Sequence, residues 1–208
     1  MKVYLVANPK GGAGKSTVAT NLAGLLAQRG WQDGASRVML GDIDRQQSSR
    51  YWLARRPANV ALIATWDIVP GEAAKPPRDT THVVLDTPAG LHGDKLKHML
   101  KQADKVVVPV QPSMFDLLAT RAFFDELATL KAARGLDTVV IGVRVDERTR
   151  AADQFHRFIE STGLPLLTCL RDTQTYVQLA AHGLTVFDVA PYRVEKDRAQ
   201  WQPIVDWV

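Results

Sequence analysis

Short apolar runs alternate with longer amphipathic segments along almost the whole chain, and this alternation limits the fold more than any other feature. Several runs are nearly continuous in valine and leucine, such as Val83-Val84-Leu85, which is typical of parallel strands covered on both faces. The expected strands are residues 2–7, 37–42, 60–64, 82–86, 105–110, 138–145 and 164–170. The expected helices are residues 15–28, 48–53, 95–102, 115–133, 151–161 and 173–182. This order predicts an α/β fold, a doubly wound and mostly parallel β-sheet with helices on both faces.

The 208 residues suit a single domain over residues 1–208, because a chain of this length buries a substantial core. Hydrophobic residues make up 46% and charged residues 23%, which argues against a disordered chain. Residues 65–81, which include Pro70-Gly71, are expected to form a loop. The one cysteine, Cys169, excludes a disulfide framework, a cysteine-rich zinc site and an iron–sulfur cluster held within one chain. No apolar run suits a signal peptide or a membrane span, which predicts a cytoplasmic protein.

The most specific motif follows the first expected strand and opens the first expected helix, with Asn-Pro-Lys-Gly-Gly-Ala-Gly-Lys-Ser-Thr over residues 8–17. Its glycines let backbone N–H groups point at phosphate oxygens, and the positive end of the helix favours the same anion. The motif predicts a phosphate loop that binds a nucleotide through Gly11, Gly12, Ala13, Gly14, Lys15, Ser16 and Thr17. Lys15 would reach the β- and γ-phosphates, Ser16 would coordinate Mg²⁺, and Thr17 would contact the α-phosphate. The alternative, a glycine-rich turn without a ligand, fits the strand, glycines and helix less well.

Carboxylates are expected at the same edge of the sheet. Asp42 and Asp44 end the second strand, where alternation places both on one side of the edge that binds ligands in such sheets. Asp86 ends the run from His82 in the form of a Walker B strand, where an acidic group holds Mg²⁺ through water. The alternatives are a helix N-cap for Asp44 and a simple capping role for Asp86.

The loop departs from the ordinary phosphate-loop pattern, because Pro9 replaces its first glycine and a second lysine, Lys10, follows. This arrangement resembles the deviant Walker family, which includes the ParA-like partition ATPases, the MinD-like proteins and nitrogenase iron protein. The resemblance covers residues 2–188, with the motifs in the family's order. It implies that Lys10 reaches across a dimer interface to the partner's ATP. The lysine would then neutralise γ-phosphate charge only in the dimer, so ATP binding favours association.

The same resemblance implies a catalytic set of Lys10, Lys15 and Asp44. The position matching Asp44 orients the attacking water in the family, and the position matching Asp42 lies near the metal. Arg45 replaces the family's usual proline and leaves this loop less restricted in φ. Residues 108–116 resemble the family's passage that borders the dimer interface, although Ser113 and Asp116 are themselves predicted to be helix caps.

Among family members, the small plasmid partition ATPases of the ParA and ParF type are the most similar, because they begin directly at the phosphate loop. Without an N-terminal helix-turn-helix, site-specific autorepression is not expected. A MinD-like membrane ATPase is the alternative, and it should end in a basic amphipathic helix. Residues 199–208 contain no lysine or arginine, and Pro203 is expected to break a helix. We expect this segment to dock on the core through Trp201, Ile204 and Trp207.

The chain has 26 lysines and arginines against 22 acidic residues, a formal charge of +4, which permits a nucleic-acid partner without requiring one. Family members bind DNA without sequence preference through their C-terminal region. The matching basic residues are Arg171, Arg193, Lys196 and Arg198. A second candidate set is Arg144, Arg148, Arg150 and Arg157. Acidic residues interleave with both sets, so a merely solvated surface is the alternative.

The resemblance therefore implies a Mg²⁺-dependent ATPase that hydrolyses ATP to ADP and phosphate and acts as a switch. With ATP it would form a homodimer that binds DNA non-specifically. An adaptor protein, ParB-like or other, would stimulate hydrolysis and release the DNA. The cargo would be a plasmid, a chromosome region or a protein assembly, and the protein would associate with the nucleoid rather than with a membrane.

Overall fold

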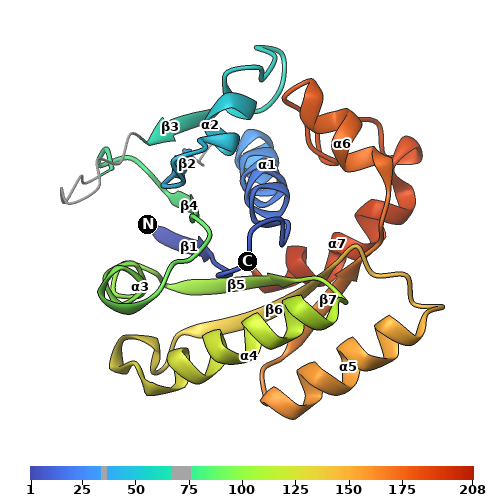
Figure 1. Ribbon diagram of the computed structural model, residues 1–208. Helices are drawn as coiled ribbons and strands as arrows, with labels where there is room; N and C mark the ends of the chain where they lie inside the picture. The colour runs from blue at the N-terminus through green and yellow to red at the C-terminus, as the bar shows by residue number, and fades with distance from the viewer. Residues whose placement is uncertain (34–36, 67–75) are drawn as a thin grey trace.

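The computed structural model describes residues 1–33, 37–66 and 76–208, and within these ranges seven strands form one sheet in the order β3-β2-β4-β1-β5-β6-β7. Neighbouring strands are parallel throughout this sheet (Figure 1). The strands are β1 (Lys2–Val6), β2 (Val38–Asp42), β3 (Ile63–Trp66), β4 (His82–Asp86), β5 (Lys105–Val110), β6 (Asp137–Val143) and β7 (Leu166–Leu170). The predicted doubly wound parallel sheet is confirmed.

Helices cover both faces of the sheet (Figure 1). One face carries α1 (Lys15–Asp33), α2 (Ser48–Leu53), α6 (Gln174–Ala181) and α7 (Glu195–Trp207). The other face carries α3 (Gly93–Leu100), α4 (Met114–Thr129) and α5 (Arg150–Thr162). Two short 3₁₀ turns, η1 (Lys131–Ala133) and η2 (Pro191–Arg193), follow α4 and precede α7.

The strand β1 shows why the apolar runs are continuous. Successive side chains of a strand point to opposite faces of its sheet. Val3 and Leu5 pack in the core beneath α3, α4 and α5, whereas Tyr4 and Val6 pack in the core beneath α1 and α7. All four side chains are buried. Because both faces are covered, every position of the strand must be apolar.

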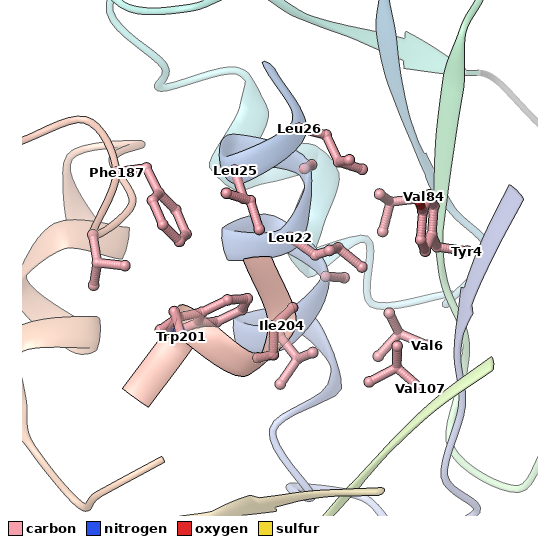
Figure 2. Close-up of a cluster of buried hydrophobic side chains, with 14 of the residues drawn as sticks. Tyr4, Val6, Leu22, Leu25, Leu26, Val84, Val107, Phe187, Trp201 and Ile204 are labelled. Carbon is pink, nitrogen blue, oxygen red and sulfur yellow. The ribbon is translucent and has the colours of Figure 1, made fainter. Parts of the chain in front are cut away.

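The C-terminal helix α7 is part of the core, as the sequence predicted. Figure 2 shows Trp201 and Ile204 packed beside Leu22 and Leu25 of α1. The Trp201 indole donates a hydrogen bond of 3.0 Å from Nε1 to the Tyr176 hydroxyl. Its ring also meets that of Phe187 edge-on, with 5.5 Å between centroids. Trp207 is partly buried against the same core.

The prediction that Pro203 breaks a helix is wrong, because α7 continues through it. A proline in a helix interior removes one backbone hydrogen bond and clashes with the preceding turn, which costs about 3 kcal/mol. Trp201 and Ile204 on either side of it are 0% and 1% exposed. Burying two such side chains offsets the loss at the proline.

Several boundaries also differ from the expected ones. β3 begins at Ile63 because residues 57–60 form a turn, in which the Val60 amide donates to the Pro57 carbonyl. α1 extends to Asp33, and β3 includes Trp66 at the start of the expected 65–81 loop. Residues 67–75 of that loop, with Pro70-Gly71, lie outside the described residues. None of the described helices combines the length and apolar character of a membrane span.

Replacing Trp201 with alanine should lower the free energy of unfolding by about 3–5 kcal/mol, because it empties a fully buried site and removes the bond to Tyr176. Urea unfolding followed by circular dichroism measures the loss. Gln202→Ala, on the exposed side of the same helix, is the matched control and should change stability by about 0.5 kcal/mol or less. Equal stability of the two variants would contradict the docking of α7.

Candidate functional site

Three neighbouring strands end level at one edge of the sheet. In the parallel register, Asp86 at the end of β4 pairs with Val6 of β1 on one side and with Asp42 of β2 on the other. The pairing continues past β2, where the Ile43 amide donates to the Asp86 carbonyl at 3.0 Å. Asp42 and Asp86, two of the three carboxylates that the sequence predicted at this edge, therefore lie on adjacent strands.

Asn8 fixes the loop that leaves β1. Its side chain is 1% exposed, and Oδ1 accepts a 2.8 Å hydrogen bond from the Lys10 amide. Its Nδ2 donates to the Pro109 carbonyl at 2.8 Å and to the Thr120 hydroxyl at 3.3 Å. The start of the glycine-rich loop is thus tied to β5 and α4. The sequence analysis gave Asn8 no role, because its partners are about a hundred residues away in the chain.

Two glycines of the loop adopt conformations that other residues disfavour. Gly12 has φ of 79° and Gly14 has φ of 86°. At Gly14 an added Cβ would also lie 2.9 Å from Cγ1 of Val143, so the loop packs directly on the end of β6. The glycines therefore shape a turn that exposes backbone N–H groups just before α1 begins.

Lys15 is the first residue of α1 and is 7% exposed. Its ammonium donates a 2.8 Å hydrogen bond to the Lys10 carbonyl, so the lysine lies across its own loop. Burial lowers the pKa of Lys15 below its usual value, while the charges of Asp86 and Asp44 act in the opposite direction. The site thus holds a buried cation that gains from any further anion brought to the loop.

Asp86 is the most perturbed carboxylate of the site. It is 1% exposed, and its Oδ2 accepts a 2.5 Å hydrogen bond from the Ser49 hydroxyl. Burial raises the pKa of Asp86 to about 6, although the hydroxyls of Ser49 and Ser16 and the charge of Lys15 lower it. Ser49 lies at the start of α2, and nothing in the local sequence singled it out.

These groups fit a divalent cation with oxygen ligands. Among the described residues, Oδ1 of Asp86 has no hydrogen-bond partner although it is buried. A buried carboxylate oxygen without a partner is costly, and a cation or its water would satisfy it. Mg²⁺ prefers carboxylate oxygen, hydroxyl and water, which Asp86 and the neighbouring Ser16 could supply.

Asp42 and Asp44 arrange the backbone between β2 and α2. The two oxygens of Asp42 accept hydrogen bonds from the Asp44 amide at 3.0 Å and the Arg50 amide at 3.1 Å. Burial raises the pKa of Asp42, and those amides lower it. Asp44 accepts from the Gln46 amide at 3.0 Å, and Gln47 rather than Asp44 is the N-cap of α2. The N-cap alternative for Asp44 is therefore wrong.

The predicted phosphate loop and Asp44 line one cleft. Its other walls come from the segments after β2, β4 and β6 and from α3, and its lining includes Gly11, Gly12, Ala13, Gly14, Lys15, Ser16, Thr17, Asp44, Arg45, Pro88, Ala89, Gly90 and Arg144. Two contacts tie neighbouring segments to the loop. The Gly90 amide donates to the Pro9 carbonyl at 2.8 Å, and the Gln111 side chain donates to the Gly12 carbonyl at 2.5 Å.

Arg144, a candidate for DNA binding, lines the cleft. It follows β6 and has φ of 57°, a left-handed conformation that is uncommon outside glycine. Such strained residues cluster at functional sites, where surrounding structure maintains them. An exposed arginine at this position could approach a bound nucleotide, a role that the sequence analysis missed.

The remaining candidates lie elsewhere. Ser113 is the N-cap of α4 and accepts from the Asp116 amide, so the predicted cap at Ser113 is confirmed. Asp116 lies in the first turn of the helix and its carboxylate accepts from the Ser113 hydroxyl, so the prediction that Asp116 itself is a cap is wrong. Arg171 forms an ion pair of 2.8 Å with the buried Asp197. Arg198 lies over the Phe187 ring.

Exposed basic residues occur in both candidate sets. Arg193 and Lys196 are exposed at η2 and the start of α7. Arg148 is exposed and pairs with Asp146 at 2.9 Å. Arg150 and Arg157 are exposed on α5.

Comparison with known proteins agrees with this geometry. The family model described as the CobQ/CobB/MinD/ParA nucleotide binding domain matches residues 4–197. The carboxysome distribution protein A of Gloeobacter kilaueensis is 27% identical over 209 residues, which cover 99% of this chain and 93% of that protein. The protein of the same name from Halothiobacillus neapolitanus is 28% identical, covering 88% of this chain and 86% of that protein.

A solved structure shares the whole fold. It is a plasmid partition protein from Borrelia burgdorferi bound to AMPPNP, with a TM-score of 0.72 and 18% identity. The superposition covers 100% of this chain and 99% of that chain. At 18% identity this likeness establishes the fold alone. Membership of the family rests on the family model that matches residues 4–197.

The high pKa of Asp86 predicts how stability depends on pH without nucleotide or metal. The folded protein holds the Asp86 proton up to about pH 6, whereas the unfolded chain releases it near 3.8. The contribution of Asp86 to stability should therefore fall as pH rises from about 4 to 6. Asp86→Asn removes this loss and should be about 2–3 kcal/mol more stable than wild type at pH 8, with no gain at pH 4.

Urea unfolding in EDTA at several pH values provides the measurement. Asp125→Asn, an exposed position on α4, is the control and should follow wild type at every pH. A constant difference between Asp86→Asn and wild type across this range would show that burial does not raise the pKa of Asp86.

Proposed function

The chain belongs to the CobQ/CobB/MinD/ParA nucleotide-binding domain family and is an ATPase, and from this premise we propose that it is a positioning switch. ATP joins two copies into a dimer, the dimer binds DNA without sequence preference, and hydrolysis stimulated by an adaptor protein releases it. Binding to DNA is then controlled by ATP rather than by the concentration of the protein.

The proposed dimer is supported by an exposed apolar patch on α4. The first turns of α4 expose three large apolar side chains, Met114, Phe115 and Leu118, which are 60%, 76% and 62% exposed. They follow Gln111, whose side chain bonds the phosphate loop at Gly12. Exposed apolar patches of this kind mark protein interfaces. A second copy is the occupant that would cover the patch and bring two nucleotide clefts together.

The nucleotide would lie in the cleft at the start of α1. The loop amides and Lys15 would hold the phosphates, and Thr17 would contact the α-phosphate. The side chain of Lys10 forms no hydrogen bond or ion pair with the described residues, although its backbone is held by Asn8 and Lys15. We assign it to the partner's ATP, where it would neutralise γ-phosphate charge only in the dimer.

Hydrolysis would depend on the segment after β2. Asp44 lines the cleft and would orient the attacking water. Mg²⁺, held by Ser16 and through water by Asp86 with Asp42 nearby, would supply charge neutralisation at the phosphates. Arg45, which stands where the family has proline, is exposed on the same segment. An adaptor that reorders this segment would raise the rate.

The cargo we propose is a large protein assembly rather than a plasmid or a chromosome region. The relatives that match 99% and 88% of this chain are carboxysome distribution proteins, whereas a ParA protein matches 56% of it. Membrane attachment through the C-terminus is the alternative in the same family. It is disfavoured because the apolar residues of α7, Trp201 and Ile204, are buried in the core rather than available to a bilayer.

DNA binding tests this function. With a slowly hydrolysed ATP analogue, the protein should bind any DNA sequence with a steep dependence of affinity on salt, and with ADP it should bind much more weakly. Replacing Arg193 and Lys196 with alanine should flatten the slope of log affinity against log salt by roughly two to four units per dimer, at about 0.9 per lost phosphate contact. Fluorescence anisotropy on two unrelated duplexes measures both effects.

The matched control removes the same charge elsewhere, from Lys131 and Arg134 beyond α4, and should leave the slope unchanged. Binding to anionic vesicles without binding to DNA would replace this proposal by the membrane-associated alternative. Equal DNA affinity with ATP analogue and with ADP would refute the nucleotide switch.

A further inference from the structure

Three side chains able to bind a metal lie together at a position that the nucleotide cleft does not use. Glu147 comes from the segment between β6 and α5, His156 from α5 and Cys169 from β7. One ligand atom from each residue lies within 4.8 Å of the other two. Among the described residues, no other group of three histidine, cysteine or acidic side chains has its ligand atoms this close together. The Nε2 atom of His156 and Oε2 of Glu147 are already 2.8 Å apart.

The sheet makes room for the sulfur atom. Cys169 on β7 pairs with Gly142 on β6. An added Cβ at Gly142 would lie only 2.8 Å from Sγ of Cys169, so a larger residue there would displace the thiol. The absence of a side chain on β6 thus lets the thiol lie beneath the loop that carries Glu147. Cys169 and His156 are half-buried, while Glu147 is exposed and able to rotate.

The donor set selects the kind of ion. One sulfur, one imidazole nitrogen and one carboxylate oxygen suit zinc and similar transition ions, whereas Mg²⁺ prefers oxygen donors alone. Ligand atoms on one tetrahedral zinc ion lie roughly 3.5 Å apart, so small rotations of Glu147 and His156 would complete the geometry. A water molecule would fill the fourth position.

We propose that Glu147, His156 and Cys169 form a binding site for a single zinc ion. The ion would connect the β6–α5 segment to both α5 and β7. That segment begins at Arg144, which lines the nucleotide cleft, so an occupied site would fix one wall of the cleft. The proposal does not depend on the positioning function, because the three ligands lie outside the phosphate loop and the segments proposed to act on ATP.

Binding would release a proton. Burial raises the pKa of the Cys169 thiol to about 12, and the nearby Glu147 charge adds to this effect. When the zinc–sulfur bond forms, the thiol proton passes to solvent and the sulfur lone pair is donated to the metal.

Cobalt(II) is the probe, because a cobalt–thiolate bond absorbs strongly in the near ultraviolet. The full chain, reduced and without nucleotide or Mg²⁺, should bind one equivalent of Co²⁺ with this absorption, and Zn²⁺ should displace it. Cys169→Ser should abolish the absorption. His156→Ala and Glu147→Gln should each weaken binding by more than the roughly 10–100-fold that loss of an outer-shell partner costs.

His182→Ala and Glu195→Gln are the matched controls, with the same changes at exposed positions at the end of α6 and the start of α7, and both should bind like wild type. Circular dichroism verifies that each variant is folded. If Cys169→Ser does not fold, the difference in Co²⁺ affinity between wild type and His156→Ala tests the site. Lack of the cobalt–thiolate absorption in wild type overturns the site, as does equal binding by His156→Ala and His182→Ala.

Discussion

Asp86 lies where β4 ends, and the parallel pairing of β4 with β1 and β2 determines what surrounds it. The register places Asp42 on the adjacent strand and the phosphate loop directly after β1. A shift of one residue in any of these pairings would turn the carboxylates to the other face of the sheet. The pKa of Asp86, the unpartnered Oδ1 atom and the position of Lys15 all depend on this arrangement.

Three hydrogen bonds join the segments around the cleft, an arrangement that suits the proposed switch. Gly90 bonds Pro9, Gln111 bonds Gly12, and Ser49 bonds Asp86. Each contact connects the phosphate loop or its neighbouring carboxylate to a different crossover segment. The apolar patch at the start of α4 directly follows the segment that contains Gln111, so the phosphate loop and the proposed dimer surface are physically connected.

The sequence predicted the parts whose cause is local. Strand runs, the glycine-rich loop and the cap at Ser113 depend on neighbouring residues, and the structure has them. Asn8 and Ser49 were missed because their partners are distant in the chain. The prediction of a helix break at Pro203 failed for a similar reason, because burial of Trp201 in the core outweighs the local cost of a proline inside a helix. Likewise, nothing local showed that Arg171 would be paired with the buried Asp197.

ATP-dependent association through Lys10 is the central claim, and light scattering tests it most directly. With a slowly hydrolysed ATP analogue, wild type should change from a 23.0 kDa monomer to a dimer, while Lys10→Ala should bind the analogue and stay monomeric. Lys131→Ala, which removes an equal charge far from the loop, should dimerise like wild type. Dimerisation of Lys10→Ala at the wild-type concentration, or a wild type that stays monomeric with the analogue bound, would contradict the account.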